Sequence, residues 1–284
     1  MHPLGRKVAH MKEILPISSR SNATVLRVAS LKEKKYRDKY SSFLVEGWKL
    51  VEEALLSHLP VYEIFISEKK SELYLDAVLQ ALQKSEMEEC SIFVLSEACF
   101  EKISTEKSPQ GIIAVIKHLD FFQECIKINK KSIFDSSKIL CLYSVRDPGN
   151  LGAIVRSAAA FGTDTLILSN DCADVYNPKT LRAAMGSLFK LRIFIAENMA
   201  ACVSELRALG RRVFAAELTE HAQALDQIDL GATDVFVIGN EGHGISEEIS
   251  SLCTQSVYIP IARGVESLNA SVAASVLLWE LGKK

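Results

Sequence analysis

Three short stretches of the chain combine polar side chains with glycine, and each follows a run of apolar residues. They are residues 146–158, 238–245 and 258–269. Together they carry asparagine, arginine, glutamate and serine, but no obvious strong nucleophile. Such a set can hold a polar cofactor through backbone groups and can position an RNA phosphate or sugar. The pattern indicates a transfer reaction whose nucleophile comes from the substrate.

The third stretch has the clearest local structure. Residues 257–261 are typical of a buried strand, and a turn at 262–264 leads to a polar group that includes Ser267 and Asn269. A helix with many small residues follows. Backbone N–H groups at its start suit a ligand with acceptor atoms. The alternative is an ordinary strand–turn–helix unit capped by Ser267 or Asn269.

The first stretch begins with Asp-Pro-Gly, which favours a turn, and Asn150 then suits the N-cap of a helix that ends near Gly162. Arg156 is surrounded in sequence by alanine, valine and isoleucine. An arginine on so apolar a helix either extends its charged end into water or meets a specific anion. The composition of the helix alone favours extension of the charged end into water.

In the second stretch, three glycines within six residues allow the backbone to approach a ligand closely. Glu241 follows a predicted strand, at the edge where open α/β sheets bind ligands. The order GxxGxG differs from the GxGxxG of dinucleotide sites, so a nicotinamide-dependent oxidoreductase is a weaker alternative. No catalytic serine triad, HExxH or P-loop is present.

These stretches belong to an alternating series of strands and helices. The series covers residues 138–284, and its strands are continuous apolar runs, which are typical of a parallel sheet covered on both faces. The predicted strands are 139–145, 165–168, 191–195, 212–216, 235–239 and 256–261.

A smaller α/β domain is predicted at residues 22–118, with strands at 41–46, 62–66, 92–95 and 111–116. A helix is expected from Asn22 through the basic residues up to 37. Residues 1–21 are predicted to be a tail. Residues 119–137 are predicted to be a linker, with a helical turn around 121–126.

The composition argues against a membrane protein, a secreted protein and a metal-binding or disulfide-linked protein. Nearly half of the 284 residues are apolar, no run reaches membrane-spanning length, and no signal peptide is recognisable. The seven cysteines form no CxxC pair, and no histidine lies at ligand spacing, so we expect neither a metal site nor disulfides, and a cytoplasmic location. Residues 1–40 carry ten Lys/Arg and three Asp/Glu in a chain of net charge −2. This asymmetry is compatible with a polyanion partner such as RNA, or with a solvated helix face.

At the three stretches the sequence resembles the SpoU-like, or SPOUT, RNA ribose 2′-O-methyltransferases. Residues 147–158, 238–244 and 259–273 resemble that family's three motifs in order and spacing, and residues 177–186 resemble a segment between them. Many members have glycine where this chain has Arg263. The N-terminal part resembles, more weakly, the substrate-binding domain of the ribosomal RNA branch, at residues 43–47 and 109–115.

The resemblance implies a C-terminal domain with a deep trefoil knot, S-adenosylmethionine as cofactor, and a homodimer that forms through this domain with the active site near its interface. It implies cofactor binding around Gly239, Ile259 and Leu268. The residues that match the family's catalytic set are Asn150, Arg156, Glu241, Ser267 and Asn269.

The implied reaction is methyl transfer to a ribose 2′-OH, most simply in large-subunit ribosomal RNA, because the N-terminal domain resembles that branch. Two alternatives stay open on the same scaffold, a transfer RNA methyltransferase and a catalytically silent RNA-binding factor.

Overall fold

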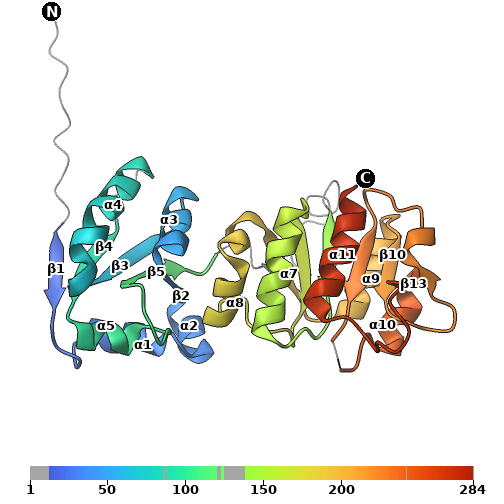
Figure 1. Ribbon diagram of the computed structural model, residues 1–284, viewed down its shortest axis with the longest axis horizontal. Helices are drawn as coiled ribbons and strands as arrows, with labels where there is room; N and C mark the ends of the chain where they lie inside the picture. The colour runs from blue at the N-terminus through green and yellow to red at the C-terminus, as the bar shows by residue number, and fades with distance from the viewer. Residues whose placement is uncertain are drawn as a thin grey trace, which may run out of the picture. The chain divides into compact units, whose positions relative to one another are not determined.

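The computed structural model describes residues 13–85, 87, 89–119, 123–124, 138–240 and 242–283, and it divides the chain into two compact units between Lys117 and His118 (Figure 1). Both units are α/β, as predicted. Within the described ranges, every helix falls short of the length and apolar character that a membrane span requires.

The first unit is built on a mixed sheet in the order β1-β4-β3-β5-β2. β1, β4 and β3 are parallel, and β5 runs antiparallel to both β3 and β2. Apolar side chains of α1 and α5 pack on one face, and α3 and α4 cover the other (Figure 1). The strands are β1 (Ile14–Ile17), β2 (Ser42–Glu46), β3 (Val61–Ser67), β4 (Ser91–Leu95) and β5 (Ile112–Lys117). The helices are α1 (Ala23–Ser30), α2 (Lys34–Tyr40), α3 (Trp48–Leu56), α4 (Ser71–Lys84) and α5 (Glu97–Ile103).

Two predictions for this unit are wrong in part. Residues 14–17 of the predicted tail form β1, which pairs with β4 along its whole length. The single helix expected after Asn22 is two helices, because the chain turns between α1 and α2. Asn22 does cap α1, accepting a hydrogen bond from the Thr24 N–H at 2.9 Å. The guanidinium of Arg37 is buried and donates to the carbonyls of Leu31 and Lys32, which fixes the turn.

In the second unit, the described residues form an eight-stranded sheet in the order β11-β13-β10-β12-β7-β8-β9-β6, and every pairing is parallel. The strands are β6 (Gln123–Glu124), β7 (Ile139–Leu142), β8 (Thr165–Ser169), β9 (Arg192–Ala196), β10 (Val213–Ala216), β11 (Gln223–Ala224), β12 (Val235–Ile238) and β13 (Gln255–Tyr258). The helices are α7 (Pro148–Ala160), α8 (Pro178–Ala184), α9 (Met199–Ala208), α10 (Glu247–Leu252) and α11 (Ala270–Gly282).

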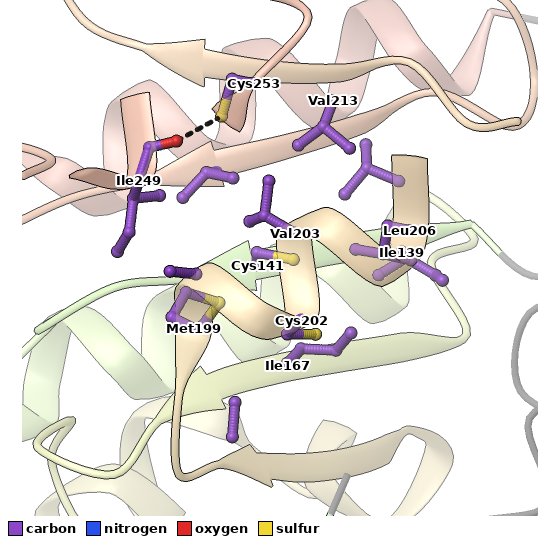
Figure 2. Close-up of a cluster of buried hydrophobic side chains, with 14 of the residues drawn as sticks. Ile139, Cys141, Ile167, Met199, Cys202, Val203, Leu206, Val213, Ile249 and Cys253 are labelled. Atoms are coloured by element: carbon purple, nitrogen blue, oxygen red, sulfur yellow. Dashed lines mark hydrogen bonds between the residues drawn. The ribbon is translucent and has the colours of Figure 1, made fainter. Parts of the chain in front are cut away.

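The sheet of the second unit is covered on both faces, as its continuous apolar strands predicted. On one face, Ile139 and Cys141 of β7 pack with Val203 of α9 and Ile249 of α10 in a buried apolar cluster (Figure 2). On the other face, α7 lies beside α8 and α11 (Figure 1). Gly152 permits this packing, because a Cβ at that position would lie 2.4 Å from the Thr180 carbonyl oxygen of α8.

The predicted linker is also wrong in part. Residues 123–124 form β6, which pairs with β9 and therefore belongs to the second sheet. This excludes a helical turn at those two residues, while residues 120–122 and 125–137 lie outside the described residues. The strand order places β13 between β10 and β11, which precede it in the chain. The trefoil knot stays a prediction.

Candidate cofactor pocket and active site

A pocket of about 760 Å³ lies at the carboxyl ends of β10, β12 and β13. Three loops and the start of α11 line it, through residues 216–218, 238–240, 243–245, 257–263, 265–268 and 270. The carboxyl edge is where open parallel sheets bind ligands, because the loops that follow neighbouring strands meet there. Two of the three predicted stretches thus come together in one place.

The loop after β12 is closed by its own hydrogen bonds. Asn240 and Gly244 exchange backbone hydrogen bonds of 3.2 and 2.8 Å. The Asn240 side chain accepts from the Gly242 N–H at 2.7 Å and donates to the Ser144 carbonyl at 2.9 Å. A tight loop is thereby held to the neighbouring strand end, and Gly244 adopts the left-handed backbone (φ +64°) that favours glycine.

Gly239 is restricted by this closure. A Cβ on Gly239 would lie 2.4 Å from the backbone of Gly244, closer than real contacts allow. The wall of the pocket is therefore bare backbone at this point, and a ligand can approach it closely.

The three residues predicted to bind the cofactor, Gly239, Ile259 and Leu268, all line this pocket. Ser267, from the predicted catalytic set, lines it too. Sequence reasoning missed Glu217, which follows β10 at the same edge and accepts hydrogen bonds from Ser250 and Ser256. The rule that ligands bind beyond the carboxyl ends of parallel strands applies to β10 as well, so the signal was available.

Asn150 and Asn269 lie together, because the Asn269 amide donates to the Asn150 side-chain oxygen at 3.0 Å. Asn269 caps α11 by accepting from the Ser271 N–H at 2.9 Å. The prediction that Asn150 caps α7 is wrong. Asp147 is the cap, accepting from the Asn150 N–H at 2.9 Å, so the Asn150 side chain points to the neighbouring helix start instead.

Asp147 is itself held by a neighbour in the segment between the motifs. Its carboxylate accepts a hydrogen bond from the Lys179 ammonium at 2.8 Å. That hydrogen bond, together with the one from the Asn150 N–H, lowers the pKa of Asp147. The cap of α7 therefore stays ionised at neutral pH, which suits the positive end of a helix.

Arg156 lies two turns further along α7, and its side chain is exposed. It is absent from the lining of the pocket in its own chain. Of the predicted catalytic set, the structure thus pairs Asn150 with Asn269 and places Ser267 in the pocket, while Arg156 stands apart. Glu241 lies outside the described residues.

The donor set of the pocket fits S-adenosylmethionine. The volume lies in the range of small-molecule sites. Ile259 and Leu268 offer apolar surface to an adenine ring, and the bare backbone at Gly239 offers polar groups at close range. Among the described residues, no group of three or more His, Cys, Asp or Glu side chains is arranged to hold a metal ion.

Comparison with known proteins covers both units. Residues 137–279 match the SpoU rRNA Methylase family, and residues 22–114 match the MRM3-like substrate binding domain. The chain is 33% identical to a 23S rRNA (guanosine(2553)-2'-O)-methyltransferase of Bacillus subtilis, over 93% of this chain and 98% of the relative. It is 30% identical to the mitochondrial rRNA methyltransferase 3A of Danio rerio, over 89% of this chain and 67% of the relative.

Among solved structures, the AdoMet-bound rRNA methyltransferase of Sinorhizobium meliloti superposes with a TM-score of 0.82 at 27% identity, covering 95% of this chain and 98% of that one. The likeness thus extends over both units and includes a structure that holds the expected cofactor. The three polar stretches, the pocket that two of them line and these matches lead to one conclusion: the chain belongs to the SpoU rRNA methylase family.

Proposed function

We propose that the protein transfers a methyl group from S-adenosylmethionine to the 2′-hydroxyl of a ribose in large-subunit ribosomal RNA. The observation that carries the proposal is the pocket at the carboxyl ends of β10, β12 and β13, whose lining includes Gly239, Ile259 and Leu268. The full-length likeness to a 23S rRNA 2′-O-methyltransferase supports the choice of substrate.

When bound, S-adenosylmethionine supplies an electrophilic methyl group on a sulfonium, so the reaction needs alignment of the ribose hydroxyl and removal of its proton. The Asn150–Asn269 pair offers amide donors and acceptors beside the pocket and would orient the sugar. Ser267 would contribute its hydroxyl from the wall of the pocket.

Arg156 would orient the sugar and its neighbouring phosphate, because a guanidinium binds phosphate well. It is a poor base, since the guanidinium remains protonated in proteins. Glu241 would hold Arg156 or the cofactor loop. These roles are hypotheses that rest on the motif match.

A homodimer through the second unit would explain why Arg156 is absent from the pocket of its own chain. Supporting this, large apolar side chains remain exposed on α11 and the loop before it, namely Val265 (52%), Val272 (48%) and Trp279 (54%). Apolar side chains left exposed on one helix and the loop before it are compatible with an interface. In such a dimer, Arg156 of one protomer would serve the pocket of its partner.

The dimer and the shared site are tested together by complementation. Arg156→Ala would remove the arginine, and Gly239→Ala would distort the loop that walls the pocket, because its Cβ would clash with the Gly244 backbone. We expect each variant alone to be inactive and the two co-expressed to regain methyl transfer through mixed dimers. Absence of any recovery, with both variants folded and dimeric by light scattering, would argue that each protomer carries a complete site.

We further propose a cytoplasmic location. Five of the cysteines in the described ranges are buried, which is compatible with a reducing compartment. Because relatives include mitochondrial enzymes, fractionation of the source cells is the direct measurement.

The central experiment maps ribose methylation in total RNA with and without the gene. We expect one 2′-O-methyl group to disappear from large-subunit ribosomal RNA and to return when the purified protein and S-adenosylmethionine are added. A loss confined to transfer RNA would redirect the assignment. An unchanged map would leave an RNA-binding factor as the better description.

A further inference from the structure

A second, smaller pocket of about 310 Å³ lies next to the cofactor pocket, at the carboxyl ends of β7 and β8. The two pockets share Asn240, His243 and Gly244, so the closed loop after β12 forms a wall between them. The remaining lining is polar, and none of these residues belongs to the predicted catalytic or cofactor-binding sets: Tyr143, Ser144, Arg146, Asp171 and Ser246.

The Asp171 carboxylate is the centre of the hydrogen bonds in this second pocket. One carboxylate oxygen accepts from the Ser169 hydroxyl at 2.6 Å. The other accepts from the Ser144 hydroxyl at 2.5 Å and from the Arg146 guanidinium at 2.9 Å. Burial alone would raise the pKa of Asp171, but these hydrogen bonds outweigh burial and lower the pKa to about 2. The carboxylate is therefore ionised at neutral pH and fixes the position of Arg146.

Arg146 keeps most of its hydrogen-bonding capacity. A guanidinium has about five N–H donors, and Asp171 takes one of them, while 67% of the side chain stays exposed. His243 and Ser246 add further polar groups to the same pocket. Arg146 thus presents several donors to the pocket, and the Asp171 carboxylate beside them disfavours a second anion such as phosphate.

Ser144 couples this pocket to the cofactor loop. Its backbone has the left-handed conformation (φ +58°), which is uncommon for a residue other than glycine. Its N–H donates to the Ser169 hydroxyl at 2.8 Å, and its carbonyl accepts from the Asn240 side chain at 2.9 Å. Such strain tends to persist where neighbouring contacts hold a functional geometry.

We propose that the second pocket binds the base of the nucleotide whose ribose is methylated, and that Arg146 selects guanine or uracil, which carry a carbonyl oxygen at O6 or O4, over adenine or cytosine, which carry an amino group there. The proposal rests on the proposed function. Enzymes that act on one nucleotide commonly extrude its base into a pocket beside the reacting atom. Arginine pairs best with the O6 and N7 acceptors of guanine, and the keto oxygens of uracil are acceptors of the same kind. Arg146 is thus a positioning residue for the reaction.

The test uses the full chain and an unmodified large-subunit rRNA transcript. Once the methylated nucleotide is mapped, each of the four bases is placed at that position, and kcat and KM are measured for the parent and for Arg146→Ala. We expect the parent to favour guanine or uracil by about 10-fold or more in kcat/KM. We expect Arg146→Ala to reduce that preference to within about 3-fold, mainly through KM, with the affinity for S-adenosylmethionine unchanged.

A matched control is Arg212→Ala, which removes another arginine paired with an aspartate, Asp234, at the opposite edge of the sheet. It should keep the preference for the base. If Arg146→Ala also keeps the parental preference, the pocket does not read the base and the inference is overturned, while the proposed function stands. A parent protein that binds S-adenosylmethionine but methylates no RNA would overturn the proposed function and this inference with it.

Discussion

Residues of the predicted catalytic set differ in whether the structure gives their side chains a hydrogen-bond partner. The Asn150–Asn269 contact joins two helix starts, so both residues have structural partners as well as a proposed role. Arg156, by contrast, stands exposed on a helix whose other side is apolar. Solvation alone explains such a position, so the proposed role of Arg156 rests on the motif match.

Replacing Arg156 with alanine should lower methyl transfer by at least about 100-fold, the lower bound for losing a group that assists proton removal or orientation. The affinity for S-adenosylmethionine, measured by calorimetry, should stay within about 2-fold, because Arg156 does not line the pocket. Arg156→Lys is the charge-matched control and should recover little, since an ammonium lacks the planar fork. Activity of Arg156→Ala close to that of the parent would leave the arginine as a solvated surface residue.

Asp171 gives a pH-dependent prediction. Its pKa falls from about 3.9 in an unfolded chain to about 2 in the folded protein. The lowered value means that the carboxylate stabilises the fold above pH ~4 and that this contribution disappears as pH falls towards 2. Asp171→Asn should therefore reduce the urea midpoint at pH 7, and the gap to the parent should narrow below pH ~4. A gap that is constant down to pH 2.5 would contradict the assigned hydrogen bonds.

At the scale of elements, α7 is the helix that connects the parts of the site. It carries Asn150 and Arg156, packs against α8, and is joined to α11 through a hydrogen bond of 2.8 Å between Ser157 and Ser275. Small residues make this close approach possible. The stability of the second unit should therefore be sensitive to added volume on α7.

Gly152→Ala tests this packing. The new methyl group would meet the Thr180 carbonyl at 2.4 Å, so we expect a loss of about 1–3 kcal/mol in the free energy of unfolding. Gly282→Ala in α11 is the matched control, because its added Cβ would be 3.5 Å from its nearest neighbour, an ordinary contact. That variant should be neutral or slightly stabilising. Urea denaturation of both variants measures the difference, and equal losses would disprove the close contact.

The basic helix α2 allows a test of RNA binding. Lys34, Lys35 and Lys39 are exposed, whereas Arg37 is buried and structural, so only the lysines should meet phosphates. Replacing all three with glutamine should flatten the log–log salt dependence of RNA affinity by up to roughly 2 units, at about 0.7 per contact. The triple arginine variant keeps the charge and should keep the slope. An unchanged slope in the glutamine variant would mean that α2 is only a solvated face.

Strands with continuous apolar sequences were predictable from the sequence, whereas short strands such as β1 and β11 were not. The strands through Leu140, Ile193 and Val237 stood out because parallel strands buried on both faces have few polar residues. β1 was missed because it is a short edge strand that contains Pro16 and is exposed over most of its length. Two-residue strands such as β11 carry too little pattern to detect.

The part of the candidate site at the carboxyl ends of the strands was predictable, because loops from distant stretches of the chain meet at that edge of a parallel sheet. The carboxyl-edge rule and the motif match together located Gly239, Ile259 and Leu268, which share one pocket. The rule says nothing about side-chain direction. It therefore could not show that Asp147 would replace Asn150 as the cap of α7, or that Ser144 and Asp171 would build a second pocket.

For the whole molecule, the division into two compact units predicts separable tasks. A protein lacking residues 1–117 should fold, and S-adenosylmethionine should raise its melting temperature as it does for the full chain. His118 is retained because it stacks on Tyr176 within the second unit, at 4.4 Å between ring centroids. Methylation of large-subunit rRNA by this fragment should be weak through a raised KM. Normal methylation would mean that the first unit does not bind the substrate.

The order of the two units along the chain has a consequence for synthesis of the protein. The strands of the first unit find all their partners within residues 14–117, whereas the lining of the cofactor pocket extends to Leu277. At ordinary elongation rates, about 5–20 residues per second, roughly 10–30 s separate completion of the first unit from completion of the pocket. During that interval the nascent chain has a folded first unit but no place to bind a methyl donor. A chain proposed to modify ribosomal RNA thus becomes able to do so only as it leaves a ribosome.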